Sequence, residues 1–252
     1  YIANALQKYI VDKSVEKFIE KHPDANIIFV KNEHDIEEKE FVTSLKESIS
    51  KSNISHTEII TDSLISMAGG SGNDYIVSCM KAETKNIFIP TSSKVEMFNT
   101  MLPTLLVLKR DTLSTIPEFA LFGYPEWQIY ASNMQSKMYE VGTYFYTSFF
   151  SHASFAETVR FQQNYLQWYS HMYQNIYPRY SMLGYDTGYY FLLAASKFGK
   201  NMGDNINKVS FTPMQTGFKF ERVNNWGGFV NKKIYFVHYT PEYKVEKIDF
   251  DK

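Results

Sequence analysis

The sequence predicts an α/β protein whose parallel sheet carries helices on both faces. Short, fully apolar segments such as 26–30 and 86–90 have the character of strands that are buried on both sides. Between them lie segments whose apolar residues recur at helical spacing, so strands and amphipathic helices alternate along the chain. This alternation is typical of a parallel sheet of about four or more strands.

The first half of the chain supplies most of the expected sheet. Apolar residues at helical spacing predict a helix from Ile2 to His22, and Pro23 ends it. The strands that follow are expected at 26–30, 56–60, 86–90 and 118–123. The helices between them are expected at 36–52, 62–67, 73–82 and 93–110, with a loop from Gly69 to Gly72.

Aromatic residues dominate the sequence after Val141. The elements expected there are an aromatic strand at 142–150, a long helix at 151–178, a second helix from near Asp186 to Gly199, and a β-hairpin that pairs 217–222 with 232–240 through a turn at 224–228. We expect the Asp186 side chain to cap the second of these helices.

Charge and cysteine content exclude several classes of function. The 252 residues include 26 basic and 27 acidic side chains, and no run of Lys or Arg forms a stripe suited to phosphates, so nucleic acid is not expected as a partner. The single cysteine, Cys79, excludes an internal disulfide and a cysteine metal cluster. No apolar run is long enough to span a bilayer, so we expect no membrane insertion. The chain opens without Met or a signal-like segment and is interpreted as a piece of a longer protein.

The predicted ligand site lies at the carboxyl ends of the strands, because loops open a crevice there in parallel sheets. The residues that we predict to bind a ligand follow two of these strands and are Thr91, Ser92, Ser93, Tyr124, Glu126 and Trp127. The three hydroxyl residues also suit the cap of the next helix, and "GYPEW" at 123–127 suits a tight turn into a helix. Tyr124 and Trp127 are large for a turn alone, so we expect both to be partly exposed in a pocket.

The sequence contains no recognisable catalytic machinery. The six histidines have no spacing suited to zinc. A nucleophile elbow is absent, and "GGSGN" at 69–73 lacks the lysine of a phosphate-binding loop. Ser151 and His152 are adjacent in sequence, which does not place the hydroxyl against the imidazole. We therefore predict that the protein is not an enzyme and uses no metal and no cofactor.

The order of these segments resembles the type I periplasmic-binding-protein family. The stretches that carry the resemblance are "NIFIPTSS", "FALFGYPEW", "LGYDTGYYFLLAASKFG", "GFKFER" and "KIYFVHY". Within that family the chain is most similar to branched-chain amino-acid-receptor-like proteins of bacterial envelopes, some of which carry LysM modules that bind peptidoglycan. The resemblance starts where the chain of such a protein enters its second lobe.

The resemblance implies two lobes joined by a hinge, with a small ligand closed between them. By this comparison 1–143 would form the α/β second lobe, 144–205 a hinge strand and helices of an incomplete first lobe, and 206–252 strands that return to the α/β lobe. Family members have an aromatic residue after the first strand of this lobe, whereas this chain has the charged stretch "KNEHDIEEKE" at 31–40. The ammonium group of an amino-acid ligand would meet Glu126.

We therefore expect a non-catalytic receptor module, similar to those of ABC transporters, that binds a small polar ligand in the periplasm or cell envelope. The alternative is a ligand-free interaction domain of the envelope, associated with peptidoglycan or its synthesis. The charged stretch at 31–40 favours the alternative, and Tyr124, Glu126 and Trp127 favour the receptor. The helices within 153–199 carry aromatic faces that would be costly to expose, so we also expect a homodimer through these helices.

Overall fold

The computed structural model describes residues 7–34, 38–52, 54–61, 71–112, 115–174, 176–224 and 227–251. They form two compact units. The sheet unit consists of Val11–Tyr146 and Phe236–Ile248, and the helical unit consists of the described parts of Tyr1–Ile10, Thr147–Tyr235 and Asp249–Lys252.

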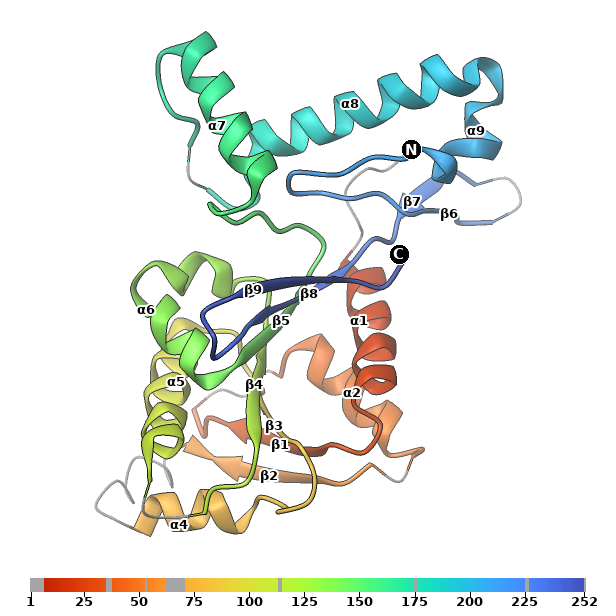
Figure 1. Ribbon diagram of the computed structural model, residues 1–252. Helices are drawn as coiled ribbons and strands as arrows, with labels where there is room; N and C mark the ends of the chain where they lie inside the picture. Colours follow the sequence, from red (N-terminus) through yellow and green to blue (C-terminus); the bar gives the residue numbers. More distant parts are fainter. Residues whose placement is uncertain are drawn as a thin grey trace. The chain divides into compact units, whose positions relative to one another are not determined.

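A seven-stranded sheet in the order β2-β1-β3-β4-β5-β8-β9 forms the centre of the sheet unit (Figure 1). Its strands are β1 (Asn26–Lys31), β2 (His56–Ile60), β3 (Asn86–Pro90), β4 (Phe119–Gly123), β5 (Thr143–Thr147), β8 (Tyr235–Tyr239) and β9 (Val245–Asp249). Strands β1 to β5 pair in parallel, which confirms the predicted α/β fold class. β3, β4 and β5 are buried along their whole length, as their continuous apolar sequence predicts.

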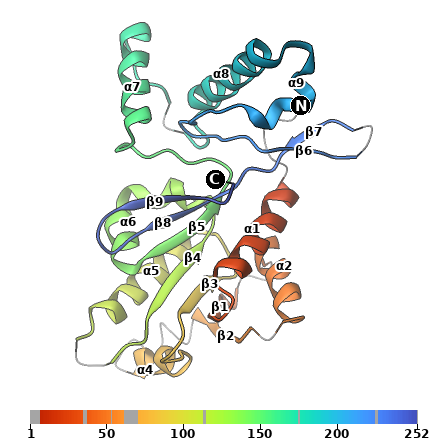
Figure 2. The same ribbon diagram turned by 45° about the vertical axis from the view of Figure 1, so that its right-hand side comes forward.

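Helices cover both faces of this sheet (Figure 2). They are α1 (Gln7–Lys21), α2 (Glu40–Ile49), α4 (Ser71–Ser78), α5 (Val95–Arg110) and α6 (Trp127–Val141). On the face covered by α1 and α2, Phe18 and Phe41 pack against Phe122 of β4, with ring centroids 4.8 and 5.4 Å from it. On the opposite face, Phe98 of α5 packs against Trp127 of α6 at 5.0 Å. The core is thus aromatic on both sides of the sheet.

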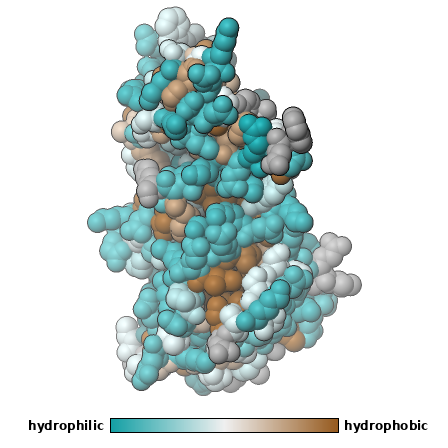
Figure 3. All heavy atoms as spheres, turned by 90° about the vertical axis from the view of Figure 1, so that its right-hand side faces the viewer, coloured by the Kyte–Doolittle hydropathy of each residue, from teal (hydrophilic) through white to brown (hydrophobic). Residues whose placement is uncertain are grey.

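The outer surface of α1 is charged. Lys13 pairs with Glu16 and Lys17 pairs with Glu20, each pair one helical turn apart. Figure 3 looks at this side of the molecule and shows hydrophilic residues over much of it, with apolar atoms visible between them. The alternation of charged and apolar residues along α1 therefore separates its solvent face from the face that packs on the sheet.

The helical unit is built from α7 (Ala156–Tyr169), α8 (Tyr180–Phe198), α9 (Met202–Asn205), short 3₁₀ turns at Gly199–Asn201 and Ile206–Lys208, and the hairpin of β6 (Phe220–Arg222) and β7 (Phe229–Asn231). Its small core joins Tyr190 and Ala194 of α8 to Ile206 and Phe220. The Tyr190 hydroxyl donates to the Ile206 carbonyl over 2.6 Å, which satisfies the polar end of this buried ring.

Several predicted boundaries differ from the structure. The long helix predicted at 151–178 begins at Ala156 and ends at Tyr169, because Ser170 adopts a left-handed conformation (φ 57°). The strand predicted at 142–150 begins at Thr143, because Gly142 ends α6 with φ 77°. The predicted helix at 62–67 and residues 69–70 of the predicted loop lie outside the described residues. The other half of that loop is helical, because α4 begins at Ser71.

The predicted C-terminal hairpin has a different partner strand. β6 pairs antiparallel with β7 and not with 232–240, and β8 within that range belongs to the large sheet. Asn231 explains the change, since its buried side chain donates to the Gly217 carbonyl and accepts from the Lys219 backbone. Residues 206–235 lie in the helical unit, and 236–248 lie in the sheet unit. The division into 1–143, 144–205 and 206–252 stays a prediction. The assignment of the units to first and second lobes stays a prediction.

Candidate functional site

The loop after β3 holds the predicted hydroxyl residues close to the sheet. Thr91 and Ser92 are buried, and Ser93 is partly exposed. The Thr91 amide donates to the Val30 carbonyl at 2.8 Å, and the Thr91 carbonyl accepts from the Lys39 amide at 2.9 Å. The residue that caps α5 is Lys94, without a side-chain hydrogen bond, although Ser92 Oγ accepts from the Lys94 amide at 3.3 Å. These residues therefore tie the end of β3 to the loop before α2.

Tyr124 lies at the carboxyl end of β4 and is completely buried. Its hydroxyl donates to the Pro90 carbonyl, which links the ends of the two neighbouring strands β3 and β4. Burial raises the pKa of the Tyr124 phenol well above its usual value, and the nearby Tyr146 and Glu126 act in the same direction. The phenol therefore stays protonated and serves as a fixed hydrogen-bond donor inside the protein.

Trp127 is also completely buried. Its ring lies over Gly123, so closely that a Cβ at position 123 would come within 2.1 Å of it. The glycine in "GYPEW" is therefore required by the indole four residues later. Our expectation that Tyr124 and Trp127 are partly exposed is wrong, because both rings pack against other aromatic side chains of the sheet unit.

Glu126 is the charged member of this turn, and its side chain reaches solvent with 40% of its surface exposed. Its Oε1 accepts from Lys39 Nζ at 2.6 Å. Its Oε2 is shielded from solvent and has no hydrogen-bond partner among the described residues. Lys39 Nζ also lies 5.7 Å from the centroid of the Tyr124 ring. The carboxyl ends of β3 and β4 thus carry an accessible pair of opposite charges above a buried aromatic cluster.

Lys39 was not predicted as a site residue. It lies in the charged stretch at 31–40, where the sequence offers several charged side chains and no periodic pattern to select one of them. The signal that could have found it is the pairing of a charged stretch after β1 with an acidic residue after β4. Strands β1, β3 and β4 are neighbours in the sheet, so their carboxyl ends lie at one edge.

Asp186 does not cap a helix, contrary to our prediction. Helix α8 begins at Tyr180, and Asp186 is a fully buried residue of its interior. Its carboxylate accepts from the backbone amides of Met214, Gln215 and Thr216 at 2.9, 2.9 and 2.8 Å. This arrangement holds the segment 214–216 against α8, so Asp186 has a structural role.

Ser151 and His152 do not form a catalytic pair in the structure. Ser151 is buried, and its hydroxyl accepts from Arg179 Nη1 at 2.5 Å. His152 Nδ1 lies 2.8 Å from the hydroxyl of Ser154. Within the described residues, no group of His, Cys, Asp and Glu side chains is arranged to hold a metal ion. None of the helices in the described part of the chain has the length and apolar character needed to cross a membrane.

Comparisons with known proteins identify the fold. Neither a model of a known protein family nor a curated protein matches the sequence. Among solved structures, the chain is similar to a protein assigned to a branched-chain amino acid ABC transporter from Rhodospirillum rubrum, with 12% identity over 98% of this chain and 66% of the other, and a TM-score of 0.53. This likeness shows a type I periplasmic-binding-protein-like fold.

Two further solved structures match over nearly the whole chain. A fatty acid ABC transporter substrate-binding protein from Thermomonospora curvata is 13% identical over 99% of this chain and 64% of its own, with a TM-score of 0.47. Full-length LpoA from Haemophilus influenzae is 10% identical over 98% of this chain and 42% of its own, also with a TM-score of 0.47. The chain therefore spans about two thirds or less of the length of the three proteins described here.

Proposed function

We propose that this chain is a non-catalytic, solute-binding-protein-like module that binds a small polar ligand at the carboxyl ends of β3 and β4. The observation that carries the proposal is the Lys39–Glu126 pair, whose side chains are 35% and 40% exposed at this edge. Ligands of parallel α/β sheets bind at such edges. The fold is shared with the Rhodospirillum rubrum protein, which is assigned to a branched-chain amino acid transporter.

The two charges define the ligand chemistry that fits. A carboxylate or other acceptor of the ligand would meet Lys39 Nζ, and an ammonium or amide group would meet the Glu126 carboxylate. The buried Glu126 Oε2 lacks a partner among the described residues, so a donor that reaches it would satisfy an acceptor that is otherwise unpaired. Ser93 is the partly exposed hydroxyl of the predicted set and lies next in sequence to the buried Ser92. The rings of Tyr124 and Trp127 are buried beneath these charged side chains.

The ligand proposal is tested by calorimetric titration of the full chain with a panel of the common amino acids, their amides and small dicarboxylates. Glu126→Gln should weaken binding of the best ligand by tenfold or more, and Lys39→Met should do the same. Glu140→Gln is the matched control, because Glu140 forms a similar pair with Arg110 at 2.6 Å on another surface of the sheet unit. A panel without any ligand, or equal losses in the Glu126 and Glu140 variants, would reject the proposal.

Two hydrogen bonds support the absence of catalysis. Ser151 accepts from Arg179, and His152 contacts Ser154, so neither is arranged as nucleophile and base. We propose that the protein performs no hydrolase, transferase or redox turnover and acts in the periplasm or cell envelope. A reproducible turnover lost on changing Ser151 or His152 to Ala would contradict the first part of this proposal.

A second candidate is a ligand-free interaction domain of the cell envelope, associated with peptidoglycan or its synthesis. It is favoured by the complete burial of Tyr124 and Trp127 and by the exposed large side chains of α7 and α8, among them Trp168 and Leu192. In this alternative the helices within 153–199 also form the homodimer interface. Light scattering tests the dimer: twice the 29.4 kDa of one chain supports it, and the mass of one chain at micromolar concentration rejects it.

A further inference from the structure

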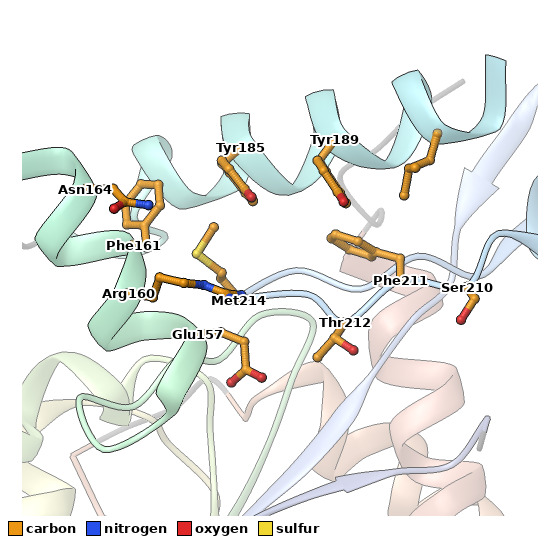
Figure 4. A pocket seen from close by; sticks show the side chains of 11 residues that line it. Glu157, Arg160, Phe161, Asn164, Tyr185, Tyr189, Ser210, Phe211, Thr212 and Met214 are labelled. Carbon is orange, nitrogen blue, oxygen red and sulfur yellow. The ribbon is translucent and has the colours of Figure 1, made fainter. Parts of the chain in front are cut away.

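A second candidate site lies within the helical unit, between α7, α8 and the segment 210–214 (Figure 4). It consists of two adjacent hollows of about 260 and 610 Å³. Both are lined by Phe161, Asn164 and Tyr185, so they adjoin at these side chains, and we refer to the two together as the groove. None of its lining residues belongs to the strand-end site of the sheet unit.

One wall of the groove is an aromatic surface on α8, made of two parallel, stacked tyrosine rings. Tyr185 and Tyr189 lie one helical turn apart, with ring centroids 5.7 Å apart and planes that differ by 5°. Each side chain is 47% exposed, so the rings remain accessible. Phe211 extends this surface, 5.9 Å from Tyr189. Figure 4 shows both tyrosines directed from α8 toward the segment that carries Phe211 and Met214.

The polar part of the lining comes from α7, which also contributes the ring of Phe161. Glu157, Arg160 and Asn164 lie at successive turns of this helix and line the smaller hollow. Within the described residues, neither Glu157 nor Arg160 forms an ion pair. They are the two charged residues that line the groove, and their charges cancel. The groove therefore offers hydrogen-bond donors and acceptors without a net charge.

The floor of the groove is fixed by the buried carboxylate of Asp186. Its hydrogen bond to the Met214 amide holds Met214, which lines the smaller hollow, against α8. The same carboxylate holds the next two amides of the segment. The distance between the aromatic wall and the floor is thus set by the fold, as expected of a binding groove that is formed before the ligand arrives.

We propose that this groove binds a neutral oligosaccharide. A sugar ring presents C–H groups on its faces and hydroxyl groups around its edge. The C–H face fits the electron-rich face of an aromatic ring such as Tyr185, and the hydroxyls fit the amide, guanidinium and carboxylate on α7. The larger hollow continues past Tyr185 to Trp168 and Tyr169, so the groove has aromatic surface for more than one sugar ring.

Other ligand classes fit the groove less well. An acyl chain would cover Glu157 and Arg160 without replacing their hydrogen bonds to water, which opposes binding. A polyanion would meet Arg160 as the single cation of the lining, beside the carboxylate of Glu157. The hydrogen-bonding wall and the zero net charge therefore favour a neutral ligand rich in hydroxyl groups.

The test is a titration of the full chain with cellotetraose, maltotetraose and chitotetraose, followed by calorimetry and by saturation-transfer NMR. We expect at least one tetrasaccharide to bind and its ring C–H protons to receive saturation from aromatic side chains. Tyr185→Ala and Trp168→Ala should each weaken binding tenfold or more. Tyr185→Phe keeps the ring and should weaken it less than threefold. Tyr180→Ala is the matched control, since Tyr180 is an exposed tyrosine of α8 that does not line either hollow.

Four outcomes would overturn the proposal. The first is that no tetrasaccharide binds the folded chain. The second is that Tyr180→Ala weakens binding as much as Tyr185→Ala does, and the third is that decanoate displaces the bound sugar. The fourth is a dimer that buries Trp168 and Tyr185 and excludes the sugar. Circular dichroism of each variant separates loss of binding from loss of folding. If Tyr185→Ala does not fold, Tyr185→Phe and Asn164→Ala are measured in its place. Asn164→Ala should then weaken sugar binding tenfold.

Discussion

The sheet unit and the helical unit place aromatic rings and carboxylates in opposite ways. In the sheet unit, Tyr124 and Trp127 are fully buried and the carboxylate of Glu126 reaches solvent. In the helical unit, Asp186 is fully buried and the rings of Trp168 and Tyr185 reach solvent. Aromatic composition alone therefore does not tell core from binding surface. An aromatic ring is buried where the neighbouring backbone leaves room for it in the core, as the backbone of Gly123 does for Trp127.

The largest expected effect comes from comparing alanine substitutions at Trp127 and Trp168. Trp127→Ala removes a buried indole and should lower the free energy of unfolding of the sheet unit by about 3–5 kcal/mol. Trp168→Ala changes a side chain that is 79% exposed and should alter stability by about 0.5 kcal/mol or less. Urea unfolding followed by circular dichroism measures both. Similar losses of unfolding free energy in the two variants would contradict the difference between a buried tryptophan in the sheet unit and an exposed one in the helical unit.

The second prediction compares the two carboxylates. Asp186→Asn keeps the shape but replaces one acceptor oxygen by a donor, so at least one of three buried amides loses its partner. Each such loss costs about 1–3 kcal/mol, and the helical unit should be destabilised accordingly. Glu126→Gln removes one charge of an exposed pair and should cost about 1 kcal/mol or less. Hydrogen exchange at Met214, Gln215 and Thr216 should accelerate in Asp186→Asn, and unchanged exchange would contradict the assigned role.

The third prediction concerns acid sensitivity of the sheet unit. Burial, together with the nearby positive charges of Lys85 and Lys21 and with His238, lowers the pKa of His22 to about 3. The folded pKa of His22 lies below its unfolded value of about 6.5, so between these two values the unfolded chain binds more protons than the folded chain. The contribution of neutral His22 to the free energy of unfolding is therefore complete above about pH 6.5 and decreases as the pH falls. The slope from this residue should approach, at most, about 1.4 kcal/mol per pH unit.

Chemical denaturation from pH 7 to pH 4.5 measures this slope, with the sheet unit followed by near-ultraviolet circular dichroism of its aromatic core. His22→Gln should make the pH dependence shallower, because glutamine does not titrate in this range. His22 Nε2 has no hydrogen-bond partner among the described residues, so protonation would create a buried charge without an acceptor. An equally steep profile in His22→Gln would show that other groups cause the acid sensitivity.

The smallest expected effect is the coupling between Lys39 and Glu126. Both side chains are more than one third exposed, so the double-mutant cycle of Lys39→Met and Glu126→Gln should give about 1 kcal/mol or less, decreasing with salt. A value this small is what we expect of a pair whose charges remain available to a ligand. A coupling of several kcal/mol would instead assign the pair to the stability of the sheet unit.

The sequence predicted the sheet better than it predicted the site. Strands β2 and β3 fall at the expected residues. For β3 the reason is its continuous apolar run between turn residues, which has few other interpretations in an alternating chain. Tyr124 and Trp127 were correctly linked to the end of β4, but their burial depends on the ring of Trp127 over Gly123, a contact between residues that a strand period does not relate. Whether the predicted residues bind a ligand stays a prediction.

The helical unit was harder to predict, because its contacts join distant segments. Asp186 has the residue type of a helix cap, and its true partners are amides 28 to 30 residues later in the chain. The hairpin partner of β6 depends on Asn231, whose hydrogen bonds to Gly217 and Lys219 are equally invisible in a local pattern. Local patterns therefore identified the elements there, while side-chain contacts decided how they pair.

The path of the chain has a consequence for how the protein is made. The chain passes between the two units four times, after Ile10, Tyr146, Tyr235 and Ile248. During synthesis, β8 and β9 leave the ribosome after the whole segment Thr147–Tyr235, although they belong to the same sheet as β5. Until then the outer side of β5 lacks its neighbour, and an unpaired strand edge is a site for wrong association. A nascent chain stalled before Phe236 should therefore be a stronger client of chaperones than the finished protein.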